Sequence, residues 1–177
     1  MLHGWGGSDY PHWQARLAGK LACNYIDVKF PLFSDFMKPK KDIWLKELRD
    51  IVDEFKPTIV VCHSLGNTLW FWYANEANIK LDKLYLVAIP SNNTGEKEEE
   101  LKSFYPMPVP DNLGAKEVTF VSSTNDPFCK IDEVEELAKR YNAKLKILKD
   151  AGHINSESGY GKWEWMEKQF DFEWSCE

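Results

Sequence analysis

Residues 58–67 read Thr58-Ile59-Val60-Val61-Cys62-His63-Ser64-Leu65-Gly66-Asn67. A β-branched run ends at Ser64, and an apolar helical pattern follows over residues 65–74. A strand, a sharp turn and a helix with a hydroxyl at the turn form a nucleophile elbow, in which the serine oxygen stands clear of the sheet. Gly66 fits the second glycine of G-x-S-x-G, but Cys62 occupies the position of the first. The alternative is a buried strand whose last serine caps the next helix.

Outward from this stretch, strand and helix patterns alternate. Apolar residues recur with the helical period in four segments besides 65–74, and Asp42 is placed to cap the second of them. The predicted helices are residues 10–20, 42–55, 65–74, 130–141 and 163–174, and the predicted strands besides the one ending at Ser64 are residues 23–28, 81–89, 117–122 and 145–148. Such alternation predicts a single α/β domain over residues 1–177, with a parallel sheet covered by helices on both faces. Residues 91–116 are rich in loop-forming residues and proline, which is typical of a small lid or binding loop.

Composition excludes several classes of protein. The formal net charge is -6 and no basic stripe is present, which argues against a nucleic-acid partner. Apolar runs are too short to span a bilayer. The N-terminus lacks a charged segment followed by an apolar core, so we expect no signal peptide. The four cysteines have no metal-ligand spacing, so we expect reduced thiols in a cytoplasmic protein; they are Cys23, Cys62, Cys129 and Cys176.

The N-terminal residues also suggest a strand end. Met1-Leu2 leads directly into His3-Gly4-Trp5-Gly6-Gly7, a pattern typical of a tight turn. An apolar stub of two residues is shorter than an ordinary strand, so we expect a truncated first strand. The glycines lack the later glycine of the dinucleotide-binding pattern G-x-G-x-x-G, and we do not interpret them that way.

Four predicted strand ends carry polar or glycine-rich residues: Gly4-Trp5, Ser64, Asp126 and His153. In a parallel sheet, functional groups gather beyond the C-terminal ends of the strands. Ser64 is a poor nucleophile until a base takes its proton, and an imidazole such as that of His153 titrates in the right range. Asp126 would hold the histidine tautomer and stabilise the imidazolium. The backbone N–H groups of Leu65 and Trp5 are the candidate oxyanion donors.

Other interpretations of these residues remain open. Asp126 precedes a proline and could be an ordinary turn residue, with Asp132 and Asp150 as rivals for its role. His153 could be a loop histidine that bonds to a carbonyl. We expect His63 to pack structurally and point away from the pocket, and His12 to lie at the surface. The thiols of Cys62 and Cys129 are expected to be bystanders.

The chain resembles the small α/β-hydrolases of the retinoblastoma-binding serine hydrolase type, also described as predicted serine esterases. Four segments carry the resemblance, and together they span nearly the whole chain: His3-Gly4-Trp5 with Trp13; His63-Ser64-Leu65-Gly66; Asp126-Pro127; and Gly152-His153 with Gly161 and Trp163. The resemblance implies a three-layer α/β sandwich with about six parallel strands, a minimal lid, and a triad at Ser64, Asp126 and His153. The departures are Cys62 and the short first strand.

These observations predict acyl transfer to Ser64 and then to water, with a small molecule carrying an ester, thioester or activated amide as substrate. The aromatic residues Trp5, Phe104, Tyr105 and Phe128 are candidates for an apolar pocket wall. This chemistry needs neither a metal nor an organic cofactor, and a monomer is the expected state. Two alternatives remain: a hydrolase-fold protein that acts by binding rather than catalysis, and a small peptidase on the same fold.

Overall fold

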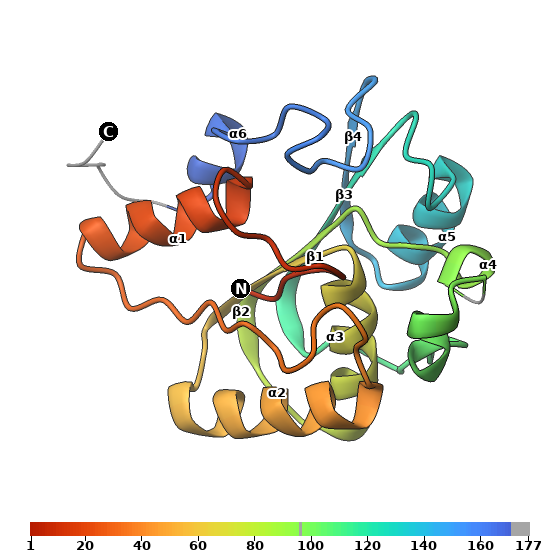
Figure 1. Cartoon of the computed structure of the whole chain (residues 1–177), viewed down its shortest axis with the longest axis horizontal. Helices are drawn as coiled ribbons and strands as arrows, with labels where there is room; N and C mark the ends of the chain where they lie inside the picture. The colour runs from red at the N-terminus through yellow and green to blue at the C-terminus, as the bar shows by residue number, and fades with distance from the viewer. Residues whose placement is uncertain (96, 171–177) are drawn as a thin grey trace.

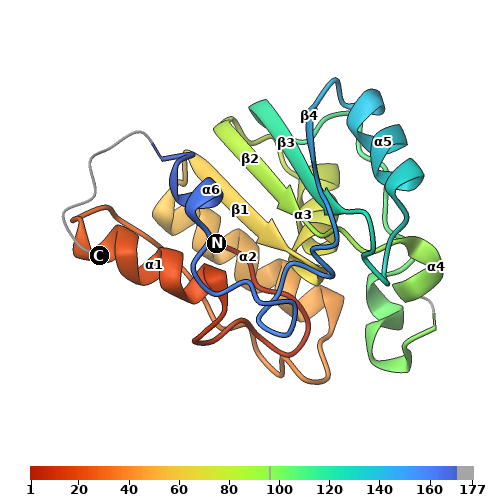
Figure 2. The same cartoon turned by 90° about the horizontal axis from the view of Figure 1, so that it is seen from above.

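A parallel sheet lies at the centre of the computed structural model, which describes residues 1–95 and 97–170. The four strands are adjacent in the order in which they occur along the chain, and all pairs are parallel. They are β1 (Ile59–His63), β2 (Leu81–Val87), β3 (Ala115–Ser123) and β4 (Lys144–Leu148). Because the strands run in one direction, their C-terminal ends meet at one edge of the sheet (Figure 2).

Helices cover both faces of the sheet (Figure 1). One face packs against α1 (Trp13–Cys23) and α6 (Glu164–Glu167), and the other against α2 (Lys41–Phe55), α3 (Leu65–Glu76) and α5 (Ile131–Arg140). The connection between β2 and β3 carries α4 (Asn92–Gly95) and a 3₁₀ helix, η1 (Glu99–Phe104). The predicted α/β sandwich is therefore confirmed.

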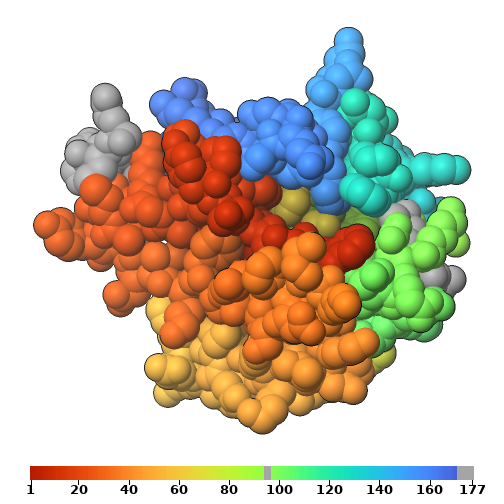
Figure 3. All heavy atoms as spheres, viewed as in Figure 1, coloured from red at the N-terminus to blue at the C-terminus, as the bar shows by residue number. Residues whose placement is uncertain are grey.

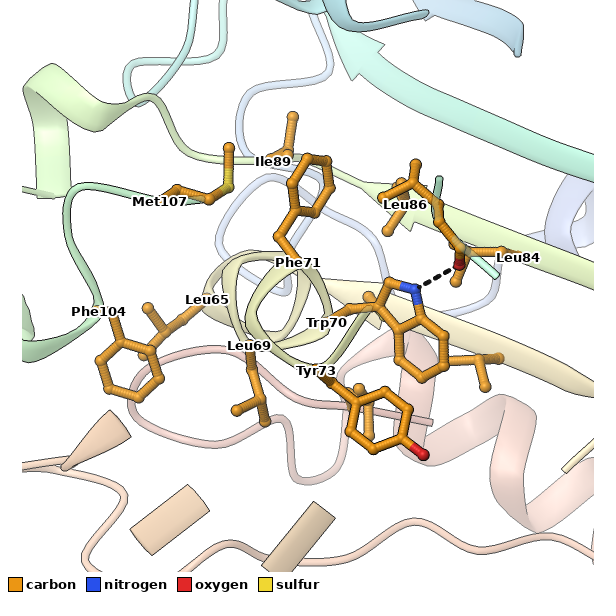
Figure 4. Close-up of a cluster of buried hydrophobic side chains, with 14 of the residues drawn as sticks. Leu65, Leu69, Trp70, Phe71, Tyr73, Leu84, Leu86, Ile89, Phe104 and Met107 are labelled. Carbon is orange, nitrogen blue, oxygen red and sulfur yellow. Dashed lines mark hydrogen bonds between the residues drawn. The ribbon is translucent and has the colours of Figure 1, made fainter. Parts of the chain in front are cut away.

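The core explains why the helix after Ser64 is so apolar. Successive strand residues face opposite clusters: Leu84 packs on the α2 and α3 side, and Tyr85 on the α1 side. The side chains of Leu69, Trp70 and Phe71 leave α3 in different directions, and all three are fully buried (Figure 4). A helix that is apolar all round belongs in the interior. The start of α3 is thus fixed by packing around it.

The sheet has four strands in the described residues, where about six were expected. At the free edge of β1, Leu2 pairs alone: its N–H donates to the Val61 carbonyl at 2.9 Å, and its carbonyl accepts from His63 N–H at 3.1 Å. The predicted strand over residues 23–28 is wrong, because α1 continues through Cys23 and no described strand lies beside the segment that follows. Extended backbone without a neighbouring strand forms no ladder.

Element boundaries also differ from the prediction. The first helix begins at Trp13 because the ring of His12 caps it, with Nδ1 accepting from Gln14 N–H at 3.2 Å. The predicted cap Asp42 lies inside the first turn of α2, and Lys40 occupies the cap position. The last helix is a single turn, and the predicted residues 171–174 lie outside the described part of the chain.

Two further findings concern the thiols and membranes. Cys62 and Cys129 are free and buried, as expected. The expectation of reduced thiols is wrong for Cys23, which is disulfide-bonded. Within residues 1–95 and 97–170, no helix has both the length and the apolar character needed to cross a membrane.

Candidate active site

Ser64 has the backbone of a strained turn. Its φ is 52° and its ψ is -125°, a combination that non-glycine residues rarely adopt. Its N–H donates to the Val87 carbonyl at 3.1 Å, so the residue is tied to the end of β2. The Asn67 side-chain amide donates to the carbonyls of both Ser64 and Val87 at 2.8 Å. Strand and helix together hold the turn, as an elbow requires.

Two glycines allow the N-terminal segment to lie against this turn. A Cβ on Gly66 would stand 2.7 Å from the carbonyl oxygen of Leu2 and 2.9 Å from that of His3. A Cβ on Gly4 would stand 2.8 Å from the Cβ of Ser64. The motif pointed to Gly66, but the need for Gly4 became visible only in the packing. Cys62, in place of the first motif glycine, lies within β1 and is fully buried.

A hydrogen-bonded chain joins Ser64, His153 and Asp126. The Nδ1 atom of His153 lies 3.0 Å from each carboxylate oxygen of Asp126, and its Nε2 lies 2.8 Å from Ser64 Oγ. An ionised carboxylate only accepts, so Nδ1 carries the ring hydrogen and Nε2 accepts from the serine hydroxyl. The Asp126 side chain is fully buried, and the ring of His153 is nearly so. This geometry suits proton transfer from serine to imidazole.

The rival carboxylates occupy other places. Asp150 accepts from the Thr124 hydroxyl at 3.4 Å, and its own N–H donates to the same Thr124 oxygen at 2.9 Å. Asp132 lies exposed in the first turn of α5. Asp126 also accepts from Phe128 N–H at 2.9 Å, which fixes the carboxylate beneath the histidine. The structure therefore brings Asp126, and neither rival, to His153.

Polar side chains that we did not predict hold the histidine loop. Asn125 Oδ1 accepts from Gly152 N–H at 2.7 Å and from the Ser123 hydroxyl at 2.8 Å. Ser123 Oγ in turn accepts from Ala151 N–H at 2.8 Å. The run Ser122-Ser123-Thr124-Asn125 at a strand end was the available signal, because these residue types bond readily to nearby backbone.

Both candidate oxyanion donors lie at the site. Leu65 is the first residue of α3, where N–H groups have no partner within the helix. Trp5 lies in the loop that follows Leu2, and its ring Nε1 donates to the Met37 carbonyl at 2.9 Å. No acceptor for the backbone N–H of Leu65 or Trp5 is found among the described residues. Both groups are thus free to bind an oxygen beside Ser64.

A largely apolar cavity of about 200 Å³ opens next to Ser64. The predicted wall residues Trp5, Tyr105 and Phe128 line it. Phe104 does not, since it is fully buried with its ring 5.5 Å from that of Trp44. The lining residues that we did not predict include Pro90, Leu101 and Asn155. Burial raises the pKa of Tyr105 to about 12, so its hydroxyl stays neutral.

A second cavity, also of about 200 Å³, shares Ser64 and His153 but has a polar lining. Its walls come from the N-terminal loop and from residues near 155, and Figure 3 shows the surface hollowed where these red and blue segments meet. His12 and His63 also line this cavity, contrary to the expectation that His63 points away from the pocket. Asp9 and Glu157 contribute carboxylates to this cavity, and Glu98 and Glu157 contribute carboxylates to the apolar one. Neither cavity is lined by a lysine or arginine from the described residues. Residues 1–95 and 97–170 also contain no cluster of three or more His, Cys, Asp or Glu side chains that could hold a metal ion.

Two more histidines lie behind His153. His63 is buried, and its ring centroid lies 5.1 Å from that of His153 and 4.8 Å from that of His12. The prediction that His12 lies at the surface is wrong: its ring caps α1, packs against that of His63 and is buried. Burial, and then the nearby His153, lower the pKa of His12 to about 4, although Asp9 opposes the shift. Burial also lowers the pKa of His63, so both rings are neutral near pH 7.

The buried thiols are poor candidates for the nucleophile. Burial raises the pKa of Cys129 to about 12, and nearby carboxylates add to this effect. Burial also raises the pKa of Cys62. Since the thiolate is the reactive form, neither thiol is activated.

Comparisons with known proteins identify the family and the fold of the chain. A family model described as serine hydrolase matches residues 1–172. The chain is 26% identical over 125 residues to the serine hydrolase RBBP9 of Rattus norvegicus, an alignment that covers 69% of this chain. The chain spans 66% of the length of that relative.

Solved structures show the same fold. The ydeN gene product of B. subtilis superposes with a TM-score of 0.82 at 18% identity, over 95% of this chain and 93% of that protein. Est1E from Butyrivibrio proteoclasticus, solved with ferulic acid bound, superposes with a TM-score of 0.63 at 18% identity, over 95% and 87% of the two chains. The four strands seen here thus form part of an α/β-hydrolase fold.

Proposed function

The chain belongs to the serine hydrolase family, and from that membership we propose that it hydrolyses small esters, thioesters or activated amides through an acyl-Ser64 intermediate. The observation that carries this proposal is the chain of hydrogen bonds from Ser64 Oγ through His153 to Asp126, with heavy-atom distances of 2.8 and 3.0 Å. Nucleophile, base and orienting carboxylate are all within reach of one another, as general-base activation of a hydroxyl requires.

In the proposed first step, Ser64 Oγ attacks the substrate carbonyl carbon while His153 Nε2 takes the hydroxyl proton. The tetrahedral intermediate collapses, the bond to the leaving group breaks, and His153 returns that proton to the leaving group. Water then attacks the carbonyl carbon of the acyl-enzyme and gives a proton to His153 Nε2. The bond from that carbon to Ser64 Oγ breaks, His153 returns the proton to Ser64 Oγ, and the carboxylic acid product is released. Asp126 keeps the proton of Nδ1 in place and stabilises the imidazolium.

Negative charge develops on the carbonyl oxygen in both steps. The N–H groups of Leu65 and Trp5 are proposed to donate to it, since both lie beside Ser64 and neither has an acceptor among the described residues. Donors that are already oriented stabilise such charge without reorganisation. In this proposal the substrate carbonyl carbon lies within reach of Ser64 Oγ, and its oxygen faces the start of α3.

The cavities suggest a substrate class. The apolar cavity of about 200 Å³ suits a small acyl group, and its Trp5 and Phe128 rings would contact it. The polar cavity beside it suits the leaving group. Apart from histidines, the charged side chains that line the two cavities in the described residues are all acidic: Asp9 in the polar cavity, Glu98 in the apolar one and Glu157 in both. We therefore propose neutral or cationic leaving groups over anionic ones. Feruloyl esters belong in the test panel because Est1E was solved with ferulic acid bound.

The test is intact-mass spectrometry after treatment with a fluorophosphonate, on wild type and on Ser64→Ala. One adduct per chain on wild type and none on the variant would support an activated Ser64. Ser103→Ala is the control, because this exposed serine accepts from Lys41 N–H and lines neither cavity. A folded wild type that takes no adduct would contradict the proposal and favour the binding-protein alternative.

A further inference from the structure

Two consecutive residues of the chain both bond to His153. Ser64 Oγ lies 2.8 Å from the ring Nε2 of His153, and His63 Nε2 lies 3.0 Å from its backbone carbonyl oxygen. A carbonyl oxygen only accepts, so His63 must donate from Nε2. In a neutral ring Nδ1 then carries no hydrogen. The end of β1 therefore contacts both the side chain and the backbone of the histidine.

The ring of His63 is held firmly enough to serve as an anchor. The residue is 4% exposed, at the end of β1, and its N–H donates to the Leu2 carbonyl. Trp13 packs against it with ring centroids 5.9 Å apart, and His12 packs at 4.8 Å. The titratable groups facing it are His12 and His153, and burial with these two neighbours lowers the pKa of His63 well below 6.5. The ring stays neutral and keeps its donor.

The loop that carries His153 has no ladder or helix of its own to fix it. The next residue, Ile154, has a φ of 52°, which is unfavourable for a β-branched side chain. Within the part of the chain that the structure describes, the N–H of His153 donates to one acceptor, the side-chain hydroxyl of Ser158, at 3.2 Å. One backbone bond, from Ile154 N–H to the Ala151 carbonyl at 3.1 Å, closes a turn around His153, and side-chain bonds to the backbone of His153 add to it. The bond from His63 comes from the strand that presents Ser64.

We propose that His63 is a positioning residue: its Nε2–H holds the carbonyl of His153 and so sets the position of the imidazole relative to Ser64. This role rests on the proposed function. No proton passes through His63 during turnover, because its donor stays on the carbonyl throughout. The contact matters because Ser64 and His153 are 89 residues apart in sequence. The bond from the neighbouring residue links their two segments directly.

The test compares two substitutions of similar size. His63→Gln places an amide donor about where Nε2 stands, and His63→Leu removes the donor but keeps an apolar side chain. We expect His63→Leu to lower kcat and the rate of fluorophosphonate labelling by roughly 10- to 100-fold, the consequence of an unpaired buried carbonyl and a displaced base. KM should change little. His63→Gln should recover to within about five-fold of wild type.

A second readout does not depend on turnover. The Nδ1 proton of His153, bonded to Asp126, should give a downfield proton resonance in wild type and in His63→Gln, and His63→Leu should shift or broaden it. If His63→Leu does not fold, His63→Asn replaces it, since its shorter amide does not reach the carbonyl. Wild-type labelling rates and an unchanged resonance in His63→Leu, or in the His63→Asn variant that replaces it, would overturn the role of His63. A wild type that shows the resonance but does not label would instead count against the proposed hydrolysis.

Discussion

Ser64 and Leu65 lie where β1 meets α3, whereas Trp5, Asp126 and His153 lie in loops; we refer to these as the elbow half and the loop half of the site. The elbow half is fixed by backbone bonds to β2 and by close packing around Gly66. The loop half is held by short backbone turn bonds, such as that from Gly7 N–H to the Gly4 carbonyl, together with side chains that bond to backbone, such as Asn125. The position of the nucleophile therefore depends chiefly on packing, whereas the positions of its partners depend on hydrogen-bond networks.

The largest expected effect comes from breaking the loop half at its carboxylate. Asp126→Asn should lower kcat by a factor on the order of 10⁴, because the amide no longer fixes the correct tautomer of His153. The fold should survive, since the two side chains have similar shape. Steady-state kinetics with a small ester measure this. Asp132→Asn and Asp150→Asn serve as controls and should retain activity; a large loss in either would reassign the acid.

Acid should destabilise the folded protein through the buried histidines that lie behind His153. The pKa of His12 is about 4 in the folded chain, below the 6.5 of an unperturbed imidazole, so between these two pH values the unfolded state binds more protons. The free energy of unfolding should therefore fall as the pH falls from about 6.5 to 4, by on the order of 3 kcal/mol from this residue. Urea unfolding at several pH values measures the slope.

The matched variant for this measurement is His12→Asn. Its amide oxygen can still cap α1, but it cannot titrate in this range. Its unfolding free energy should depend less steeply on pH than that of wild type, whatever its absolute stability. His63 shifts in the same direction and leaves some slope in the variant. If the unfolding free energies of the two proteins depended equally on pH, His12 would have nearly the same pKa in the folded and unfolded states.

A methyl group added at Gly66 should disrupt the packing of the elbow half. Gly66→Ala places a Cβ 2.7 Å from the Leu2 carbonyl oxygen, and backbone cannot move aside as a flexible side chain would. We expect a loss of about 2 kcal/mol in stability, typical of overpacking, and a fall of at least ten-fold in kcat as the Trp5 loop is displaced. Gly19→Ala is the control, because nothing lies within 4 Å of its added Cβ and alanine favours a helix. Unchanged kinetics in Gly66→Ala would mean that the N-terminal segment does not support the elbow.

Removing one amide tests the polar network of the loop half. Asn125→Ala loses the bonds to Gly152 N–H and the Ser123 hydroxyl, and should cost about 1 to 2 kcal/mol in stability with a roughly ten-fold lower kcat. KM should change less, because Asn125 does not line the apolar cavity. Asn112→Ala is the control: this residue also accepts from a backbone N–H, that of Gly114, but it precedes the far end of β3. Equal kinetic effects in both would argue against a specific role.

The same contrast explains what the sequence could predict. Regular elements carry periodic patterns, so the α/β architecture and the strand ends bearing Ser64, Asp126 and His153 were predictable from local residues. Contacts between distant segments leave no such pattern, which is why the burial of His12, the need for Gly4 and the bonds of Asn125 were missed. The segment 23–28 has strand-like residues, but a strand also requires a neighbour, and that depends on pairing elsewhere. Phe104 was assigned to the pocket because aromatic character alone does not say which way a side chain faces.

The smallest expected effect concerns the loop that carries the second oxyanion donor. Trp5→Phe removes the bond from Nε1 to the Met37 carbonyl but keeps an aromatic ring at the cavity. The side chain is exposed, so water replaces the lost partner, and two backbone bonds of the loop remain, from Gly6 to Phe36 and from Gly7 to Gly4. We expect kcat to fall about two- to three-fold, in line with a hydrogen bond worth under 1 kcal/mol.

Steady-state kinetics on one ester, with kcat and KM measured separately, decide between two explanations for any change in Trp5→Phe. A lower kcat with an unchanged KM would place the effect on the oxyanion donor, since that bond strengthens in the transition state. A higher KM alone would place it on the cavity wall. A fall in kcat beyond about thirty-fold would mean that this single exposed bond orients the donor. The loop half would then rest on one side chain at the surface rather than on a network.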